Sequence, residues 1–163
     1  MTILRFLILL SLVVWIGGIV FFIALAPIPF SVLSRHLAGQ VIAPALARLH
    51  WIGIVSAVIF LIASPLWNAM AVGSARPLAA KHLLVIAMLT LTLVSQFGVS
   101  ARMSRLRSGM GEIDSIAADD PRRVAFNTLH AWSTRLEGTV LLLGLVTIFL
   151  VARESALPRS LSR

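Results

Sequence analysis

The feature that most constrains this chain is a series of four long apolar segments, at about residues 6–26, 51–72, 83–101 and 132–152. A helix rises about 1.5 Å per residue, so about 20 apolar residues cross the roughly 30 Å hydrocarbon core of a bilayer. The composition agrees, since 59% of the residues are hydrophobic, only 12% are charged and the mean hydropathy is +0.99. We therefore predict an all-α polytopic membrane protein, with residues 1–163 forming a single domain built as a four-helix transmembrane bundle.

The first two segments leave some alternatives open. Phe6–Ala26 is read as the first span, although Arg5 and Ala24-Leu25-Ala26, which resembles a cleavage site, also allow a cleaved signal peptide. The segment is longer than the usual apolar core of such a peptide, which favours the span. The mixed stretch Phe30–His50 contains Pro44, which should prevent a straight helix, and we expect an interfacial segment that leads into the second span.

The fourth helix should be long and should begin at Pro121. An acidic cap followed by proline at the first helical position is typical of a helix start, and no breaker follows before about residue 153. The apolar stretch Thr139–Ala152 is too short to span, so the membrane segment must begin near Trp132. Glu137 then lies inside the membrane edge, about 7 Å beyond Trp132.

Polar residues on this helix recur at three- and four-residue intervals, at Asn127, His130, Thr134 and Glu137. Such spacing places them on one helix face, and we expect that face to point into the bundle near one membrane surface. One interpretation is a polar cavity that binds a ligand, because a carboxylate inside the membrane is costly unless it faces protein or water. The other is a helix end that reaches into water.

Two further sets of polar residues are candidates. His50 opens the second span and His130 precedes the fourth, so both lie toward the same membrane face and could together ligate haem or copper, or simply form hydrogen bonds at the interface. Thr92, Gln96 and Ser100 form a polar face on the third span, either for helix–helix hydrogen bonds or for a substrate path.

Charge and motifs exclude several classes of protein. The net charge is +8, but the basic residues stand mostly at the ends of apolar segments, where lipid headgroups lie, and we expect no nucleic-acid binding. The chain has no cysteine, which excludes disulfides and thiolate sites. No nucleophile elbow and no phosphate-binding glycine loop is present, which favours a protein that is not an enzyme.

The basic residues also bear on orientation. Four spans place both termini on one membrane face, which carries six basic residues: Arg5, Arg76, Lys81, Arg153, Arg159 and Arg163. The opposite face carries eight: Arg35, Arg48, Arg102, Arg105, Arg107, Arg122, Arg123 and Arg135. The positive-inside rule prefers the second face in the cytoplasm and the termini outside, whereas Arg5 favours the reverse.

Several motifs resemble a known family in order and spacing. They are Trp15–Phe22 with Ala26-Pro27 and Phe30, then Leu37–Gln40 with Pro44 and Arg48, then Arg102-Met103 with Leu106-Arg107, and finally Phe126–Ser133. This set resembles the transmembrane protein 205-like family, which is also catalogued as a bacterial domain of unknown function. The Trp-Ile-Gly-Gly opening more loosely resembles the copper-resistance D type of membrane domain.

The resemblance implies a four-helix protein of the bacterial inner membrane. The family's eukaryotic namesake is linked to tolerance of platinum drugs, which implies export or vesicular handling of metal complexes. His130 and Ser133 occupy matched signature positions and are the first residues to test. Three hypotheses follow: a transporter or tolerance factor for a metal complex or small solute, a haem- or copper-binding redox protein, and an accessory subunit of a larger membrane complex or homo-oligomer.

Overall fold

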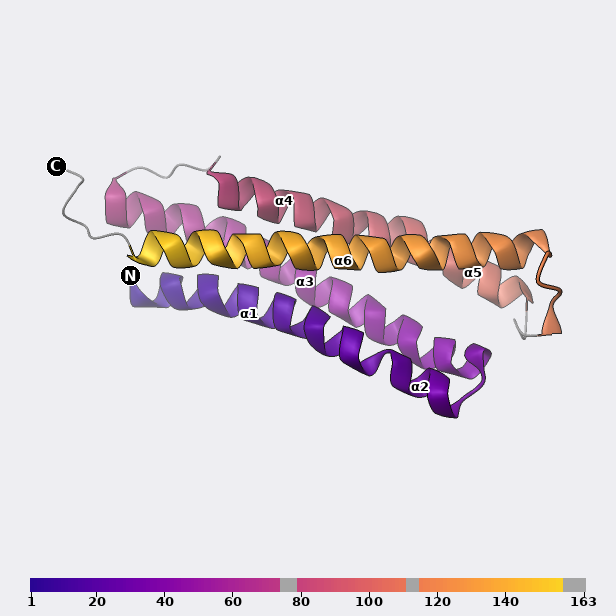
Figure 1. Cartoon of the computed structure of the whole chain (residues 1–163). Helices are drawn as coiled ribbons and strands as arrows, with labels where there is room; N and C mark the ends of the chain where they lie inside the picture. The colour runs from indigo at the N-terminus through magenta and orange to yellow at the C-terminus, as the bar shows by residue number, and fades with distance from the viewer. Residues whose placement is uncertain (74–78, 111–114, 157–163) are drawn as a thin grey trace.

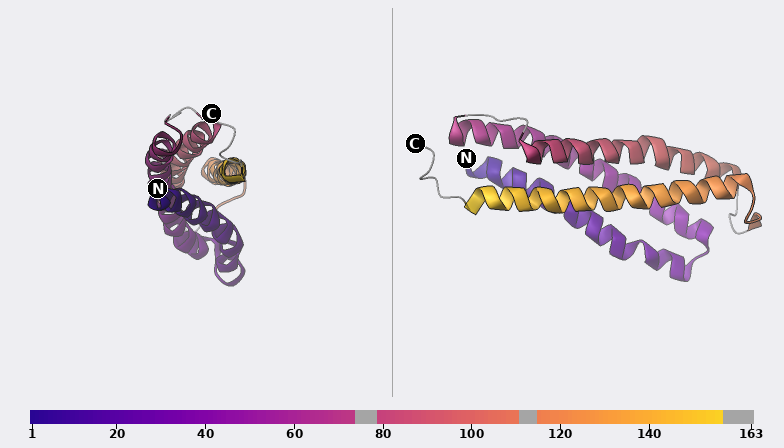
Figure 2. Two further views of the ribbon diagram at one scale, coloured as in Figure 1. Left: turned by 90° about the vertical axis from the view of Figure 1, so that its left-hand side faces the viewer. Right: turned by 45° about the horizontal axis from the view of Figure 1, so that its top comes forward.

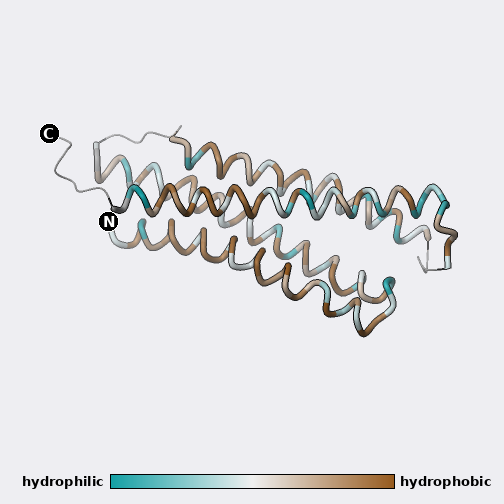
Figure 3. Tube along the Cα trace, viewed as in Figure 1, coloured by the Kyte–Doolittle hydropathy of each residue, from teal (hydrophilic) through white to brown (hydrophobic). Residues whose placement is uncertain are grey.

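The computed structural model describes residues 1–73, 79–110 and 115–156, and these residues form helices with no strand. Four helical stretches are long and apolar enough to cross a membrane, over Thr2–Val32, Arg35–Ala71, Ala80–Met110 and Pro121–Glu154. The protein is therefore an integral membrane protein with the predicted all-α, four-helix architecture. Figure 3 shows the apolar residues running along all four stretches.

The first half of the chain forms three helices. α1 covers Thr2–Leu25, and the short α2 covers Pro27–Val32. α3 covers Arg35–Val72, starting where the Ser34 side chain accepts a hydrogen bond from the Leu37 backbone N–H. Residues 30–50, predicted as an interfacial segment, form the end of α2 and the first part of α3, which continues without a break into the second span.

Two prolines, Pro44 and Pro65, lie inside α3 without ending it. Proline removes one backbone hydrogen bond, a loss that membrane helices tolerate where neighbouring groups satisfy the freed carbonyl. α3 ends at Gly73, whose φ of 71° is a left-handed conformation that glycine adopts at little energetic cost.

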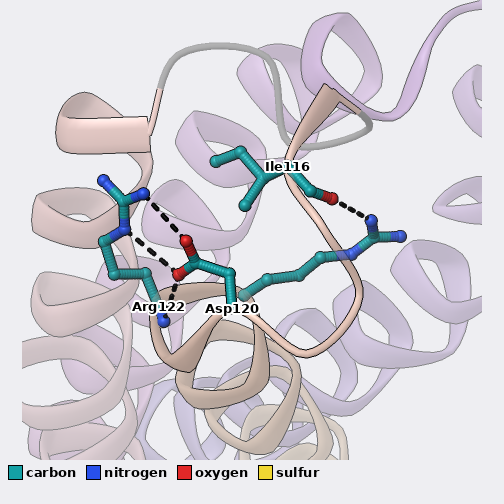
Figure 4. Close-up of polar contacts among 4 residues, drawn as sticks. Ile116, Asp120 and Arg122 are labelled. Carbon is teal, nitrogen blue, oxygen red and sulfur yellow. Dashed lines mark hydrogen bonds and ion pairs between the residues drawn. The ribbon is translucent and has the colours of Figure 1, made fainter.

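The second half forms two rods. The first consists of α4 (Ala80–Leu93), the π-helical segment η1 (Val94–Ser100) and α5 (Ala101–Met110). The second is α6, which runs unbroken over Pro121–Ala156. α6 begins at the predicted proline, and the Asp120 carboxylate accepts hydrogen bonds from the backbone N–H and the guanidinium of Arg122 (Figure 4).

The helices pack as a closed ring in which α1 contacts α3, α3 contacts α4, α4 contacts α6, and α6 contacts α1. The N-terminus and the last turns of α6 lie at one end of the bundle, here called the terminal end (Figure 1). At the other end, here called the far end, α2 and the start of α3 diverge from α5 and α6 (Figure 1). Viewed along the bundle, α1, α3 and α4 form an arc with α6 beside its open side (Figure 2).

The core is apolar and built on close approaches between helices. Its buried members are Ile8, Leu12, Trp15, Ile16, Ile19, Leu49, Ala57, Phe60, Ala63, Val85, Met88 and Val140. A Cβ atom on Gly53 would overlap the Trp15 indole, 2.8 Å from its Cε2, so glycine is what lets α1 reach α3. Large apolar side chains such as Phe21, Ile62 and Phe149 point outward, as expected for surfaces that face lipid.

Candidate functional site

Three polar side chains from three different helices meet inside the bundle. His50 of α3 places its Nδ1 2.7 Å from Gln96 Oε1 of η1, and its Nε2 2.5 Å from Glu137 Oε1 of α6. His50 is 1% exposed and Glu137 is 8% exposed. These three residues are called the polar centre below.

Two exposed tryptophans stand close to the polar centre along the chain. Trp51, next to His50, and Trp132, five residues before Glu137, are both exposed at the bundle surface. Tryptophan is enriched where acyl chains meet headgroups, so these two side chains are typical of an aromatic belt. Helix rise places Glu137 about 7 Å along α6 from Trp132 toward the terminal end, whereas His50 directly precedes Trp51.

The π-helical segment η1 carries Gln96, which contacts His50. π-helical turns inside α-helices are rare and occur frequently at functional sites. Gln96 lies in the middle of η1, and its neighbour Ser95 is 1% exposed. The Ser95 and Ser100 hydroxyls are buried and have no hydrogen-bond partner among the described residues. Nothing in the sequence of residues 94–100 predicted the π-helical segment.

The predicted stripe on the fourth helix is wrong for three of its four members. Asn127, His130 and Thr134 are exposed, and only Glu137 is buried. The inward face of α6 instead carries Ser133, Glu137, Val140, Gly144 and Thr147. It is rotated by about a quarter turn from the predicted one, because small residues that allow close packing decide which face turns inward. Ser133, a matched signature residue, is therefore buried one turn before Glu137.

The structure does not bring His50 and His130 together. His130 is exposed and stands seven residues before Glu137, about 10 Å along the helix. Both ring nitrogens of His50 already contact other side chains, so metal ligation would require one of these contacts to break. Among the described residues, no group of three or more histidine and acidic side chains is placed to hold a metal ion.

The polar face predicted on the third span is divided among different roles. The Thr92 hydroxyl donates to the Met88 carbonyl oxygen within α4, a local bond that occupies it. Gln96 binds His50, whereas Ser100 keeps a buried hydroxyl without a partner among the described residues. Of the two interpretations, helix–helix hydrogen bonding describes Gln96.

A second buried polar layer lies nearer the terminal end. His82 Nε2 is 2.9 Å from Ser64 Oγ, and Lys81 Nζ donates to Glu154 Oε2 at 2.5 Å. His82 therefore lies toward the end of the bundle opposite His50. An apolar layer that includes the fully buried Val85, Met88 and Phe60 separates this layer from the polar centre.

Arg107 connects three helices at the far end. Its guanidinium donates to the Gly39 carbonyl oxygen of α3 at 2.8 Å and lies 5.5 Å from the Phe126 ring centroid of α6. A Cβ atom at Gly39 would stand 3.0 Å from the guanidinium, so glycine leaves the space that this contact uses. All three residues belong to the motifs that carry the family resemblance, although none of them was proposed as a site residue.

Comparison with known proteins gives one match. The model of a family described as a domain of unknown function, DUF4149, matches residues 10–112. The match covers more than half of the chain and includes His50 and Gln96, whereas Glu137 lies beyond it. No curated protein and no solved structure matches the chain.

Proposed function

Because the chain belongs to the DUF4149 family, whose description names no activity, we propose a function from its buried chemistry: a small membrane transporter whose solute passes the polar centre. The observation that carries this proposal is the contact between His50 and Glu137, two ionisable side chains buried at membrane depth. Ionisable residues inside a membrane are expensive, and they typically mark ion, proton or substrate pathways.

The layered arrangement of polar groups supports the same proposal. The polar centre near the far end and the His82–Ser64 pair near the terminal end are separated by an apolar layer that includes Val85 and Met88. A transporter needs binding groups that face each side in turn and a barrier between them, so two polar layers around a dry layer suit that task. A purely structural bundle has no need for a carboxylate at this depth.

The class of solute is taken from the resemblance stated above. The transmembrane protein 205-like resemblance favours a metal complex, and export is the direction that tolerance requires. We place the protein in the bacterial inner membrane with the termini outside, following the excess of basic residues at the far end. The solute would then first contact exposed polar residues on the far-end part of α6, and the candidates are Asn127, His130 and Thr134.

The test uses cells that express the full chain and are exposed to cisplatin, with cellular platinum and growth as readouts. We expect wild-type cells to hold less platinum than cells with Glu137→Gln or His50→Asn at equal protein level in the membrane. Glu154→Gln is the matched control, because it makes the same chemical change in a half-exposed carboxylate at the terminal end. Equal platinum content and growth in all four strains would exclude handling of this complex through the polar centre.

The redox alternative has a direct readout. Haem or copper ligation by His50 and His130 requires His130 to turn inward and His50 to give up a present contact. Protein purified from cofactor-replete cells would then show a visible absorption band or bound metal that His50→Asn removes. Colourless, metal-free protein would count against the redox alternative. Recovery of the protein only within a larger complex would favour the accessory-subunit alternative.

A further inference from the structure

We propose that His50 and Glu137 form a proton-binding site that holds one shared proton and exchanges it toward the far end of the bundle. This inference deepens the proposed function, because it makes the proton the ion that is coupled to transport of the solute. The coupling rests on the proposed function. The binding of the proton itself stands on geometry alone. Three observations carry it: the orientation of Gln96, the absence of another buried charge beside the pair, and the unpartnered hydroxyls of η1.

The orientation of Gln96 fixes where the protons of His50 lie. The amide oxygen Oε1 of Gln96 faces His50 Nδ1 at 2.7 Å, and an amide oxygen can only accept a hydrogen bond. Nδ1 must therefore carry a hydrogen and donate it. The remaining contact, Nε2 to Glu137 Oε1 at 2.5 Å, joins two atoms that both accept when unprotonated. One proton must lie between them.

The pair is neutral with this proton and carries one negative charge without it. If the proton belongs to Nε2, an imidazolium donates to a carboxylate; if it belongs to Oε1, a carboxylic acid donates to a neutral imidazole. Both arrangements hold the same number of protons and the same total charge. Removing the proton leaves a neutral imidazole with its lone pair directed at a buried carboxylate, which is unfavourable until water or a cation reaches the site.

No other charged side chain compensates the pair from the helices packed around it. η1 contributes Gln96 and Ser95, and α6 contributes Ser133, all uncharged. α1 carries no ionisable side chain at this level, since its Arg5 lies at the terminal end beside Lys81 and Glu154. The nearest cations along the chain are exposed: Arg48, Arg102 and Arg135. The shared proton is therefore the positive charge that balances Glu137.

The polar groups around the pair give the exchange a direction. Toward the terminal end lie the buried Val85, Met88 and Phe60, together with Thr92 and Thr147, whose hydroxyls already donate to the Met88 and Leu143 carbonyl oxygens. Toward the far end, Ser100 lies one helical turn beyond Gln96, and its hydroxyl is buried without a partner among the described residues. A hydroxyl can donate and accept at once, so Ser100 is suited to hold a water that takes the proton to the far face.

The test is nitrogen-15 NMR of the full chain, labelled at histidine and held in lipid nanodiscs, with His50 assigned through His50→Asn. At neutral pH we expect protonated Nδ1 and a proton shared by Nε2 in the wild type. In Glu137→Gln we expect Nδ1 protonated and Nε2 bare, because a glutamine amide donates to Nε2 and brings no shared proton. Glu154→Gln should match the wild type.

A wild type in which His50 Nε2 is bare and carbon-13 labelling shows Glu137 as an ionised carboxylate at neutral pH would overturn the proposal. Exchange is tested with the same sample by transfer to deuterated buffer, where Ser100→Ala should slow the replacement of the shared proton several-fold. An unchanged exchange rate would overturn the assigned direction. These NMR and exchange measurements need no solute, so their outcome is independent of the platinum assay. The proton-binding proposal can therefore fail while platinum export depends on Glu137, and it can hold while platinum export does not.

Discussion

Gly144 is where α6 comes close to α1 and α4, and adding one methyl group there tests the packing of the bundle. A Cβ atom at this position would overlap the Ile16 side chain, 2.9 Å from its Cγ1, and would lie 3.2 Å from Met88 Cε. Ile16 and Met88 are themselves buried, so neither can turn aside freely. Overpacking of this kind costs about 1–3 kcal/mol. We expect the free energy of unfolding of Gly144→Ala to be lower by that amount than that of a variant with a glycine-to-alanine change at another position on α6.

Gly138 supplies the match, because a Cβ atom there meets nothing within 4 Å. Replacing glycine by alanine inside a helix gains about 0.5–1 kcal/mol at either position, so this gain cancels between the two variants. Gly144→Ala should therefore be less stable than Gly138→Ala by about 1–3 kcal/mol. Steric trapping in bicelles measures the free energy of unfolding of each variant. Equal stability, or a more stable Gly144→Ala, would refute the close approach of α6 to α1.

Three further predictions concern the ends of the bundle. Arg107→Ala should lose the hydrogen bond to the Gly39 carbonyl oxygen and destabilise the far end by about 1–3 kcal/mol. The loss should appear as a broader distribution of distances between spin labels at positions 40 and 104. The control variant Arg105→Ala should leave that distribution unchanged. The hydrogen bond from the Arg122 side chain is the main reason that the pKa of Asp120 is lowered to about 2 from its usual 3.8. Because the ionised carboxylate is favoured in the folded protein, the start of α6 should keep this stabilisation above pH 3.8 and lose it as the pH falls through about 2. The protection factor of the Arg122 amide, which corrects for the intrinsic pH dependence of exchange, measures that loss, and in Asp120→Asn it should stay constant over this range. Lys81→Met should leave Glu154 unpaired and increase amide exchange in the last turns of α6, whereas Lys81→Arg should not.

The architecture follows from the sequence because it depends on long-range averages. Four apolar segments of membrane-spanning length leave few alternatives, and the bilayer demands that every backbone group be bonded within its helix. The start of α6 at Pro121 was also predictable, since the acidic cap and the proline act locally. The presence of Glu137 within the membrane followed from length alone, because the apolar stretch after it is too short to span.

The partners of Glu137 could not be predicted, because they depend on how three helices are rotated about their axes. The spacing of Asn127, His130 and Thr134 predicted an inward face, yet polar residues near a helix end can reach water and need no burial. Gly144 and Thr147 decide the rotation instead, through contacts with other helices that no local pattern records. The π-helical segment around Gln96 is likewise a tertiary outcome.

The predicted pairing of His50 with His130 failed for a related reason. The apolar segments indicated that both residues lie toward the same membrane face, yet His50 contacts Glu137, whereas His130 lies about 10 Å along α6 from Glu137. Level alone does not decide whether two side chains face one another. His50 turns inward to Glu137, whereas His130 stays on the outer surface.

The central claim is that His50 and Glu137 bind each other inside the membrane, and a double-mutant cycle tests it most directly. Each single change, His50→Leu or Glu137→Leu, leaves a buried polar partner unsatisfied and should destabilise the protein by about 1–3 kcal/mol. The double variant leaves neither of the two partners behind, so its loss should be smaller than the sum of the single losses by at least about 1 kcal/mol. Strict additivity of the three unfolding free energies in bicelles would contradict the direct contact.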